Sequence, residues 1–359
     1  MTDKKLLSLL CMAIGSLPHQ DIDEAMSLVE ENFKDIPFWP QLSKMNKNEN
    51  MVVQFLENMP ACDYDENNDK MFLNTEKVSY IQELEQLFID WEDIIVKNDV
   101  KVLNKYAISK NYSSTFSTFL NIVERIKPKF AKGQIVGPFT LSTTLTDKSG
   151  RSVYYDVTLR EVITRVLSLK ALWQIKEIKR VSPNTIPIIF LDEPSLSQLR
   201  TSAYVTISPD EPVEQIKTVL DLIKANGGIS AIHCCGRCDW ANLIKTGCDI
   251  INFDAYNHSE HFLLFSNFIA EFLKNGGKIA WGLVPTLNEE SLKTITVQTL
   301  KNKFYDLIEK LSLTGLDKDF IKENSLITPS CGAASLPAYL ADKAMKMTKM
   351  LVSSISVNN

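Results

Sequence analysis

Three residues of the sequence have the chemistry and the spacing of a metal site. His233 and Cys235 are separated by one residue in an apolar run, and Cys331 directly follows another such run. On a β-strand, residues two apart point to the same face, so a His-x-Cys pair can direct both side chains to one centre. One imidazole and two thiolates suit zinc. The sequence therefore predicts a zinc site at these three residues, with a fourth position open for a carboxylate or a substrate.

The fourth ligand and the role of a further cysteine are open to interpretation. Asp254 ends the apolar run that follows His233 and Cys235, and it is a candidate carboxylate ligand. A lone His-x-Cys pair is also common among buried residues that bind no metal. A competing interpretation uses Cys238, because Cys235-Gly-Arg-Cys238 has the Cys-x-x-Cys spacing of a redox pair or a zinc knuckle. No second Cys-x-x-Cys occurs in the sequence, so we favour the set that contains Cys331.

Secondary structure must bring these candidates together, and the sequence repeats one pattern throughout. Short apolar runs rich in β-branched residues end in small, polar or metal-binding residues and are followed by segments with helical spacing. The expected strands are residues 12–16, 36–41, 134–137, 187–192, 230–235, 249–254, 278–284 and 325–330. The expected helices are residues 21–33, 77–96, 159–179, 212–224, 259–273, 300–313 and 335–352.

This alternation predicts the fold class. Runs that are apolar on both faces and alternate with helices indicate a parallel sheet. Eight such units predict an α/β protein with a single (β/α)₈ TIM barrel, which takes residues 1–359 as one domain. The interval from about 45 to 132 is too long for one crossover, so we expect a helical insertion between the second and third strands. The alternative is an open, doubly wound sheet, but no Gly-x-Gly-x-x-Gly follows the first strand.

Composition limits the class of protein. The chain has 359 residues, of which 45% are hydrophobic and 23% charged, as in ordinary globular proteins. The net charge of −5 argues against a nucleic-acid partner, and the absence of an apolar run of about 18 residues argues against a membrane partner. Four of the seven cysteines lie between residues 234 and 248, which is too crowded for a disulfide framework. We therefore expect a reducing, cytoplasmic setting.

Short motifs at the ends of the expected strands form a joint pattern. They are Ala13-Ile-Gly-Ser-Leu-Pro-His19, Phe38-Trp-Pro-Gln-Leu42, Gly137-Pro-Phe-Thr140, Leu191-Asp-Glu-Pro194, His233-Cys-Cys-Gly236, Asp254-Ala-Tyr256, Trp281-Gly-Leu-Val-Pro-Thr286 and Pro329-Ser-Cys-Gly332. Together they resemble the catalytic barrel of the cobalamin-independent methionine synthases and its single-barrel relatives, within the uroporphyrinogen decarboxylase/methionine synthase superfamily. The resemblance runs from about residue 12 to residue 340.

The resemblance implies a zinc-dependent methyltransferase of methionine biosynthesis. His233, Cys235 and Cys331 match the zinc ligands of the family, and Asp254 falls where the synthases carry a glutamate ligand. In such a site the metal activates a small thiol, foremost homocysteine, as a zinc-bound thiolate that attacks a methyl group. The resemblance thus implies that the three matched residues are catalytic through the zinc.

The resemblance also implies where the thiol substrate binds. Ile14, Gly15 and Ser16 match the segment that holds the substrate carboxylate. Asp192 matches an acid that holds the substrate amino group. This assignment agrees with charge, because backbone N–H groups and a serine hydroxyl suit a carboxylate and an aspartate suits an ammonium.

Two departures from the family change the expected methyl donor. Full-length synthases have two barrels that share the folate, and this chain has the length of one. The synthases also carry a histidine after the seventh strand that can protonate the departing folate nitrogen, whereas residues 284–290 contain no histidine here. A methyl-corrinoid needs no proton on its leaving group. We therefore expect a methyl-corrinoid donor and a corrinoid protein as a partner.

Two other functions are compatible with the expected fold. A decarboxylase of the uroporphyrinogen type needs arginines near the N-terminus to hold the substrate carboxylates, and the first hundred residues contain none. A non-catalytic zinc-binding or corrinoid-binding barrel would use the same ligands in a closed site. A metal that stays exchangeable and responds to added thiol would exclude this second alternative.

Overall fold

Six parallel strands form the main sheet of the computed structural model, which describes residues 6–65, 70–199 and 201–356. The strands are β3 Phe130–Val136, β4 Ile186–Asp192, β5 Ile229–Cys234, β6 Ile250–Phe253, β7 Lys278–Val284 and β8 Ser325–Pro329. Each strand pairs with the next one along the chain. All their residues except Ile186 are buried, which explains why the sequence shows continuous apolar runs instead of alternation. The last six expected strands are confirmed.

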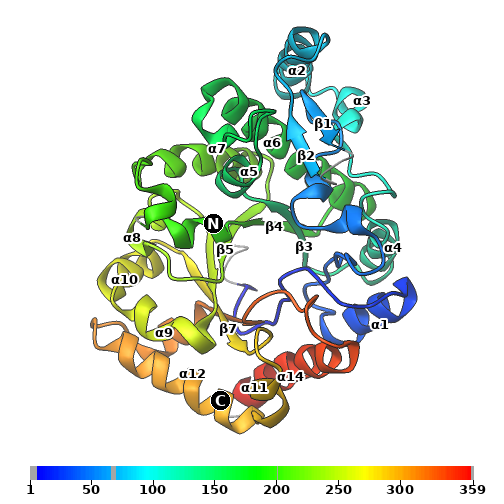
Figure 1. Ribbon diagram of the computed structural model, residues 1–359. Helices are drawn as coiled ribbons and strands as arrows, with labels where there is room; N and C mark the ends of the chain where they lie inside the picture. The colour runs from blue at the N-terminus through cyan, green and yellow to red at the C-terminus, as the bar shows by residue number, and fades with distance from the viewer. Residues whose placement is uncertain (1–5, 66–69, 200, 357–359) are drawn as a thin grey trace.

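The first two expected strands are not formed as regular strands. Single parallel bridges join these segments to each other and to the sheet: Cys11 with Ile327 of β8, Ser16 with Gln41, and Phe38 with Lys132 of β3. Pro37 and Pro40 carry no N–H group, so the second segment cannot donate a continuous ladder of hydrogen bonds. Figure 1 shows the sheet curving around a centre, with the N-terminal segments in blue between its two edge strands.

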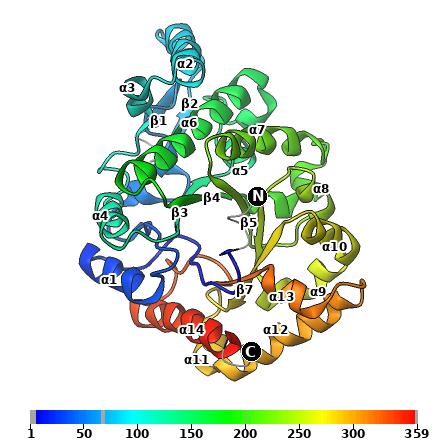
Figure 2. The ribbon, with the colours of Figure 1, turned by 180° about the vertical axis from the view of Figure 1, so that it is seen from behind.

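Helices surround the curved sheet (Figures 1 and 2). Outside the interval between residues 45 and 132 they are α1 Ile22–Asn32, α5 Pro138–Thr144, α6 Val157–Val181, α7 Glu211–Ala225, α8 Trp240–Ile244, α9 Ala255–Leu263, α10 Ser266–Lys274, α11 Glu289–Thr294, α12 Val297–Ser312, α13 Lys318–Glu323 and α14 Ala338–Ser356. Short 3₁₀ turns are η5 Val153–Tyr155, η6 Pro194–Gln198 and η7 Ser202–Tyr204. The expected helices are present, except that residues 259–273 form two helices, α9 and α10, instead of one.

Residues 45–132 form a hairpin as well as helices before β3 begins. The elements are η2 Lys47–Glu49, η3 Val53–Phe55, β1 Cys62–Asp65, β2 Lys70–Leu73, α2 Tyr80–Ile95, α3 Val100–Leu103, η4 Asn104–Tyr106 and α4 Phe116–Ile126. Strands β1 and β2 are antiparallel and separate from the main sheet. Figure 1 shows this hairpin and α2 at the periphery of the molecule. The sequence analysis expected helices here and missed the hairpin.

The inner face of the sheet changes from apolar to polar toward the carboxyl ends of its strands. An apolar cluster fills the inside of the curve and is separate from the larger core under the helices. On three of the strands, the residue two positions after a member of this apolar cluster is polar and points to the same face. The pairs are Phe190 and Asp192 on β4, Ala231 and His233 on β5, and Ile250 and Asn252 on β6. A polar layer therefore lies on top of the inner apolar cluster.

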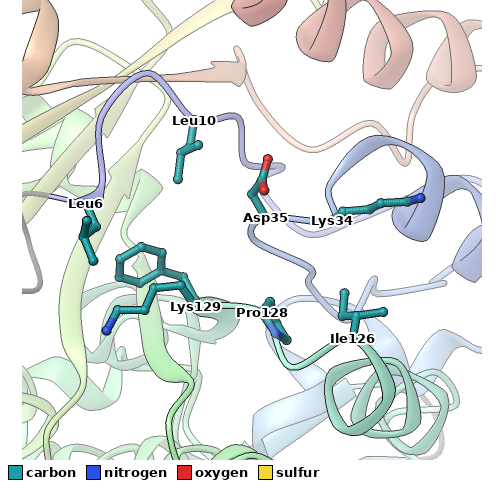
Figure 3. Close-up of a pocket in the computed structure, with 8 residues that line it drawn as sticks. Leu6, Leu10, Lys34, Asp35, Ile126, Pro128 and Lys129 are labelled. Carbon is teal, nitrogen blue, oxygen red and sulfur yellow. The ribbon is translucent and has the colours of Figure 1, made fainter.

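A cavity of about 390 Å³ lies at the opposite ends of the strands (Figure 3). It is lined by Leu6, Leu10, Lys34, Asp35, Ile126, Pro128, Lys129 and Phe130. Phe130 is the first residue of β3, so this cavity is separate from the polar layer. Across the described part of the chain, no helix has both the length and the apolar character that a membrane span requires.

Candidate metal centre

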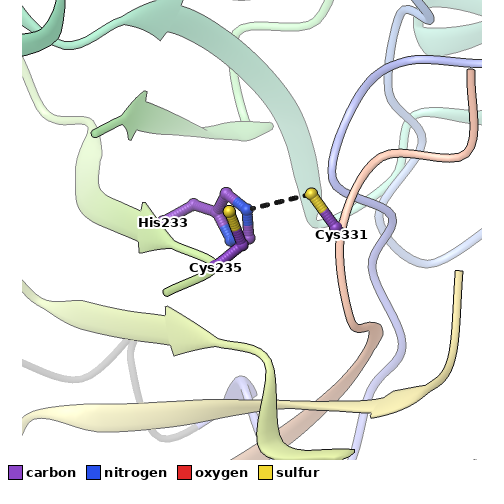
Figure 4. A group of neighbouring side chains, drawn as sticks. All are labelled: His233, Cys235 and Cys331. Carbon is purple, nitrogen blue, oxygen red and sulfur yellow. Dashed lines mark hydrogen bonds between the residues drawn. The ribbon is translucent and has the colours of Figure 1, made fainter. Parts of the chain in front are cut away.

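The three predicted metal ligands lie together at the carboxyl ends of two strands (Figure 4). His233 is on β5, Cys235 directly follows that strand, and Cys331 lies two residues beyond the end of β8. One ring nitrogen of His233 and the two sulfurs all lie within 4.8 Å of one another, and Nε2 of His233 is 3.8 Å from Sγ of Cys331. This group could therefore hold a metal ion.

The donor set and its spacing fit zinc. In a tetrahedral zinc site with bonds of about 2.1–2.3 Å, neighbouring ligand atoms lie roughly 3.4–3.8 Å apart. The separation of 3.8 Å between His233 and Cys331 falls within that range. The widest separation allowed within the group, 4.8 Å, exceeds it by about 1 Å, which rotation of a cysteine side chain can close. With three protein ligands, one coordination position stays open, as in catalytic zinc sites.

Asn252 on β6 sets the orientation and the tautomer of the His233 ring. Oδ1 of Asn252 lies 2.5 Å from Nδ1 of His233. Both hydrogens of the Asn252 amide are used elsewhere, because Nδ2 donates to the Ala280 carbonyl and to Oγ1 of Thr328, each at 2.8 Å. Oδ1 must therefore accept a hydrogen bond from Nδ1–H. In the neutral ring, Nε2 then carries no proton and faces the two sulfurs, as a metal ligand requires.

The loop that carries Cys331 is held by Thr286 and by a close approach to Ser16. Oγ1 of Thr286 accepts from the Cys331 N–H and donates to the Cys331 carbonyl, both at 3.0 Å. A Cβ at Gly332 would lie 2.2 Å from Oγ of Ser16, so a larger residue there would require the Ser16 hydroxyl to move. The N–H of Ala333 also donates to the Ser16 carbonyl at 2.9 Å. Cys331 is therefore placed against the Gly15-Ser16 turn.

The two thiols and the imidazole perturb each other. The hydrogen bond from Cys331 lowers the pKa of Cys235, and the imidazole of His233 lowers it further despite burial. Burial alone lowers the pKa of His233, but its hydrogen bond with Cys235 and the charge of that thiolate outweigh burial and raise it to about 9. The thiol of Cys235 is thus prepared to ionise, as a zinc ligand must.

Asp254 is not among the residues whose ligand atoms come together. It is fully buried as the N-cap of α9, and both of its oxygens accept hydrogen bonds from Asn257. The Asn257 N–H donates to Oδ1 at 2.8 Å, and its side-chain Nδ2 donates to Oδ2 at 2.7 Å. Asp254 therefore caps α9, and both of its carboxylate oxygens have hydrogen-bond partners. Its role as a metal ligand stays a prediction.

Asp192 presents an unpaired acid beside the metal group. It is the last residue of β4, and its Cα is the register partner of His233 on β5. Its Oδ1 is buried and has no hydrogen-bond partner in the described part of the chain. Burial raises the pKa of Asp192 to about 6, against the opposing charges of His233 and Lys132. A buried acceptor without a partner is costly, so a cationic or hydrogen-bonding group of a ligand would be favoured there.

The Ile14–Ser16 segment lies beside the cluster with donors available. Within the described residues, the N–H groups of Ile14, Gly15 and Ser16 donate no hydrogen bond, whereas the Ile14 and Gly15 carbonyls are engaged. The Ile14 carbonyl accepts from Nζ of Lys132, and the Gly15 carbonyl from the Gln41 N–H. Successive free N–H groups of this kind suit a carboxylate.

Two further acids near the site are occupied by the protein itself. Glu193 follows Asp192 but turns away, and its carboxylate accepts from the N–H groups of Phe139 and Thr140 at the start of α5. Glu49 accepts from the N–H groups of Leu42 and Ser114. Neither carboxylate is therefore available for a substrate ammonium, which leaves Asp192.

Sequence reasoning missed Asn252, Thr286 and Lys132. Asn252 had a signal, since it lies two residues before Asp254 on the face that carries the site. Thr286 closes one of the motifs quoted above. Lys132 had none, because a lysine inside an apolar strand gives no indication of its partners.

No known protein family matches the sequence, and no curated protein is similar to it.

Proposed function

We propose that the protein is a zinc-dependent methyltransferase that methylates a small thiol, most simply homocysteine. The observation that carries the proposal is the open group of His233, Cys235 and Cys331 next to the unpaired carboxylate of Asp192. Two thiolates neutralise the ion, so a substrate sulfur bound beside them stays electron-rich. Zinc, when bound, supplies the positive charge that lets the substrate thiol lose its proton near neutral pH.

The residues of the chain position the substrate for the transfer. Asp192 pairs with the substrate ammonium, and the free N–H groups of Gly15 and Ser16 hold its carboxylate. Asn252 keeps the His233 ring in the tautomer that can bind the metal. In the transfer, a sulfur–carbon bond forms between the thiolate and the methyl group. The bond from the methyl group to its donor breaks, and that electron pair remains on the donor.

The methyl donor that fits best is a methyl-corrinoid, free or carried by a corrinoid protein. The cobalt–carbon bond can break without protonation of the leaving group. A methylated folate would need an acid near the departing nitrogen, and the stretch between β7 and α11 carries no histidine. This sequence feature, together with the resemblance noted above, supports the corrinoid.

We also propose that the fold is an irregular (β/α)₈ barrel. The bridges from Cys11 to β8, from Ser16 to Gln41 and from Phe38 to β3 connect the two edges of the six-stranded sheet. In this interpretation the two N-terminal segments take the places of the first and second strands. The metal group then lies at the carboxyl-terminal mouth, where active sites of such barrels are found.

The deciding experiment is metal analysis combined with a thiol response. We expect about one zinc per chain, and we expect the Co²⁺-substituted protein to change its visible spectrum when homocysteine is added, because a sulfur enters the open position. Methylcobalamin should then yield methionine. A metal spectrum that ignores every thiol would indicate a closed, non-catalytic site and refute the proposal.

A further inference from the structure

Lys132 on β3 is a fully buried lysine inside the curved sheet, next to the proposed substrate site. Its Nζ donates to the Ile14 carbonyl and to Oε1 of Gln134, the latter at 3.0 Å. The ammonium also lies 4.7 Å from the centre of the Phe190 ring. Burial lowers the pKa of Lys132 to about 8, and the negative charge of Asp192 raises it. Burying an ammonium group costs free energy, so we expect the contacts of Lys132 to have a specific role.

The contacts of Lys132 reach the two segments that lack a strand ladder. Gln134, which Lys132 touches, donates through Nε2 to the Trp39 carbonyl at 2.9 Å. Lys132 itself holds the Ile14 carbonyl directly. These segments carry only single bridges to the sheet. Side-chain hydrogen bonds therefore replace part of the missing backbone ladder. Lys132 therefore fixes how the peptide unit between Ile14 and Gly15 is turned.

The orientation of that peptide unit decides where its N–H points. A peptide N–H and C=O point in opposite directions, so a carbonyl held by Lys132 directs the Gly15 N–H away from the ammonium. Neither Gly15 nor Ser16 uses its N–H within the described chain. Successive N–H groups of this kind, with a fixed positive charge behind them, attract an anion.

We infer that Lys132 is a positioning residue that selects thiols carrying a carboxylate, by holding the Ile14 carbonyl so that the Gly15 N–H faces the substrate, while the Gln41 N–H, which donates to the Gly15 carbonyl, holds the next peptide unit. The inference rests on the proposed thiol-binding function and refines it. The substrate class is a short aliphatic thiol with a terminal carboxylate. The amino group adds a second contact, at Asp192, whose charge interacts with that of Lys132.

Four thiols separate these contacts in the Co²⁺-substituted protein. Homocysteine carries both charged groups, 3-mercaptopropionate only the carboxylate, cysteamine only the ammonium, and 2-mercaptoethanol neither. The Lys132→Met variant should bind the two carboxylate-bearing thiols about 10- to 100-fold more weakly, as expected for the loss of a charge-assisted contact. Its affinity for 2-mercaptoethanol and its metal content should stay at the wild-type level, and its affinity for cysteamine should not fall together with that for the two carboxylate-bearing thiols.

Lys170→Met is the matched control. Lys170 is equally buried on α6, burial lowers its pKa to about 8 as well, and its Nζ has no hydrogen-bond partner among the described residues. Its substitution should leave all four thiol affinities unchanged. An equal loss for all four thiols in Lys132→Met, or a loss of metal, would show that Lys132 is only structural and overturn the inference.

The wild-type protein gives a second test that does not depend on the folding of a variant. It should bind 3-mercaptopropionate more tightly than 2-mercaptoethanol by a similar factor. A wild-type protein that responds to thiols without this preference would overturn the inference and leave the proposed function standing. A protein that responds to no thiol would overturn both.

Discussion

Substitution of Asn252 tests the architecture of the metal centre most directly. Asn252→Ala removes the hydrogen-bond acceptor of His233 Nδ1, since Nδ1 lies 2.5 Å from Oδ1 of Asn252. It also leaves the Ala280 carbonyl and the Thr328 hydroxyl without their donor. Asn252→Asp keeps the acceptor toward His233 but loses both donated hydrogen bonds. The two variants therefore separate the orientation of the histidine from the stability of the strands.

The expected magnitudes follow from these contacts. Loss of a group that orients a metal-binding histidine typically weakens metal binding by about 10- to 100-fold, or about 1.4–2.7 kcal/mol. We expect that loss in Asn252→Ala. In Asn252→Asp, zinc affinity should equal or exceed that of the wild type, because a carboxylate is a stronger acceptor for Nδ1–H. Both variants should lose about 1–3 kcal/mol of unfolding free energy for each buried group left unpaired.

Zinc affinity can be measured by competition with a chromophoric chelator, and stability by urea unfolding of the metal-free protein. Asn32→Ala is a suitable control, because Asn32 is also buried and donates to a backbone carbonyl, that of Leu28, within α1. It should lose stability without any change in zinc affinity. If Asn252→Ala folds and binds zinc as tightly as the wild type, Asn252 does not orient the ligand and our account of the site is wrong.

Three further predictions concern other parts of the molecule. Cys331→Ser should lose zinc while circular dichroism shows an intact fold, because the residue lies in a loop beyond β8, and Cys248→Ser, at a buried site elsewhere, should retain zinc. Lys170→Met should raise the unfolding free energy at pH 7 by up to about 3 kcal/mol, since burial lowers the Lys170 pKa from 10.5 to about 8. Because the unfolded chain holds that proton to higher pH, the wild type should gain stability between pH 8 and 10.5, and pH-dependent urea unfolding should show a smaller gain in the variant, which keeps the contribution of Lys132. Gly332→Ala should weaken zinc binding, because its Cβ would meet Oγ of Ser16 at 2.2 Å, and the double variant with Ser16→Ala should recover part of the loss.

The sequence predicted the strands that are buried on both faces and missed the irregularity of the first two segments. β4 to β8 contain apolar runs that no other element explains as well. The segment at 36–41 has an equally apolar run, but Pro37 and Pro40 remove two of its donors. Whether such a segment still lies beside a sheet depends on side chains elsewhere, here Lys132 and Gln134. That information is tertiary and was not visible in the pattern.

The candidate site was predictable in its ligands and less so in its supports. Residue type and two-residue spacing identify His233 and Cys235, and a strand-end position identifies Cys331. The role of Asn252 depends on the register between β5 and β6, which pairs it with His233. Asp254 illustrates the opposite case, because an aspartate three residues before an asparagine can be a helix cap as well as a ligand. The hydrogen-bond partners of the Asp254 carboxylate, which only the structure shows, distinguish a helix cap from a metal ligand.

The bridge between Cys11 and Ile327 has a consequence for how the chain folds during its synthesis. Ile327 leaves the ribosome long after Cys11. The N-terminal segment can contact the 36–41 segment and β3 earlier, but its bridge to β8 must wait until β8 emerges, a long-range pairing of the kind that slows folding. Cys331 emerges only after β8. Incorporation of a metal at all three side chains would thus report that the segment after β8 has reached the end of β5.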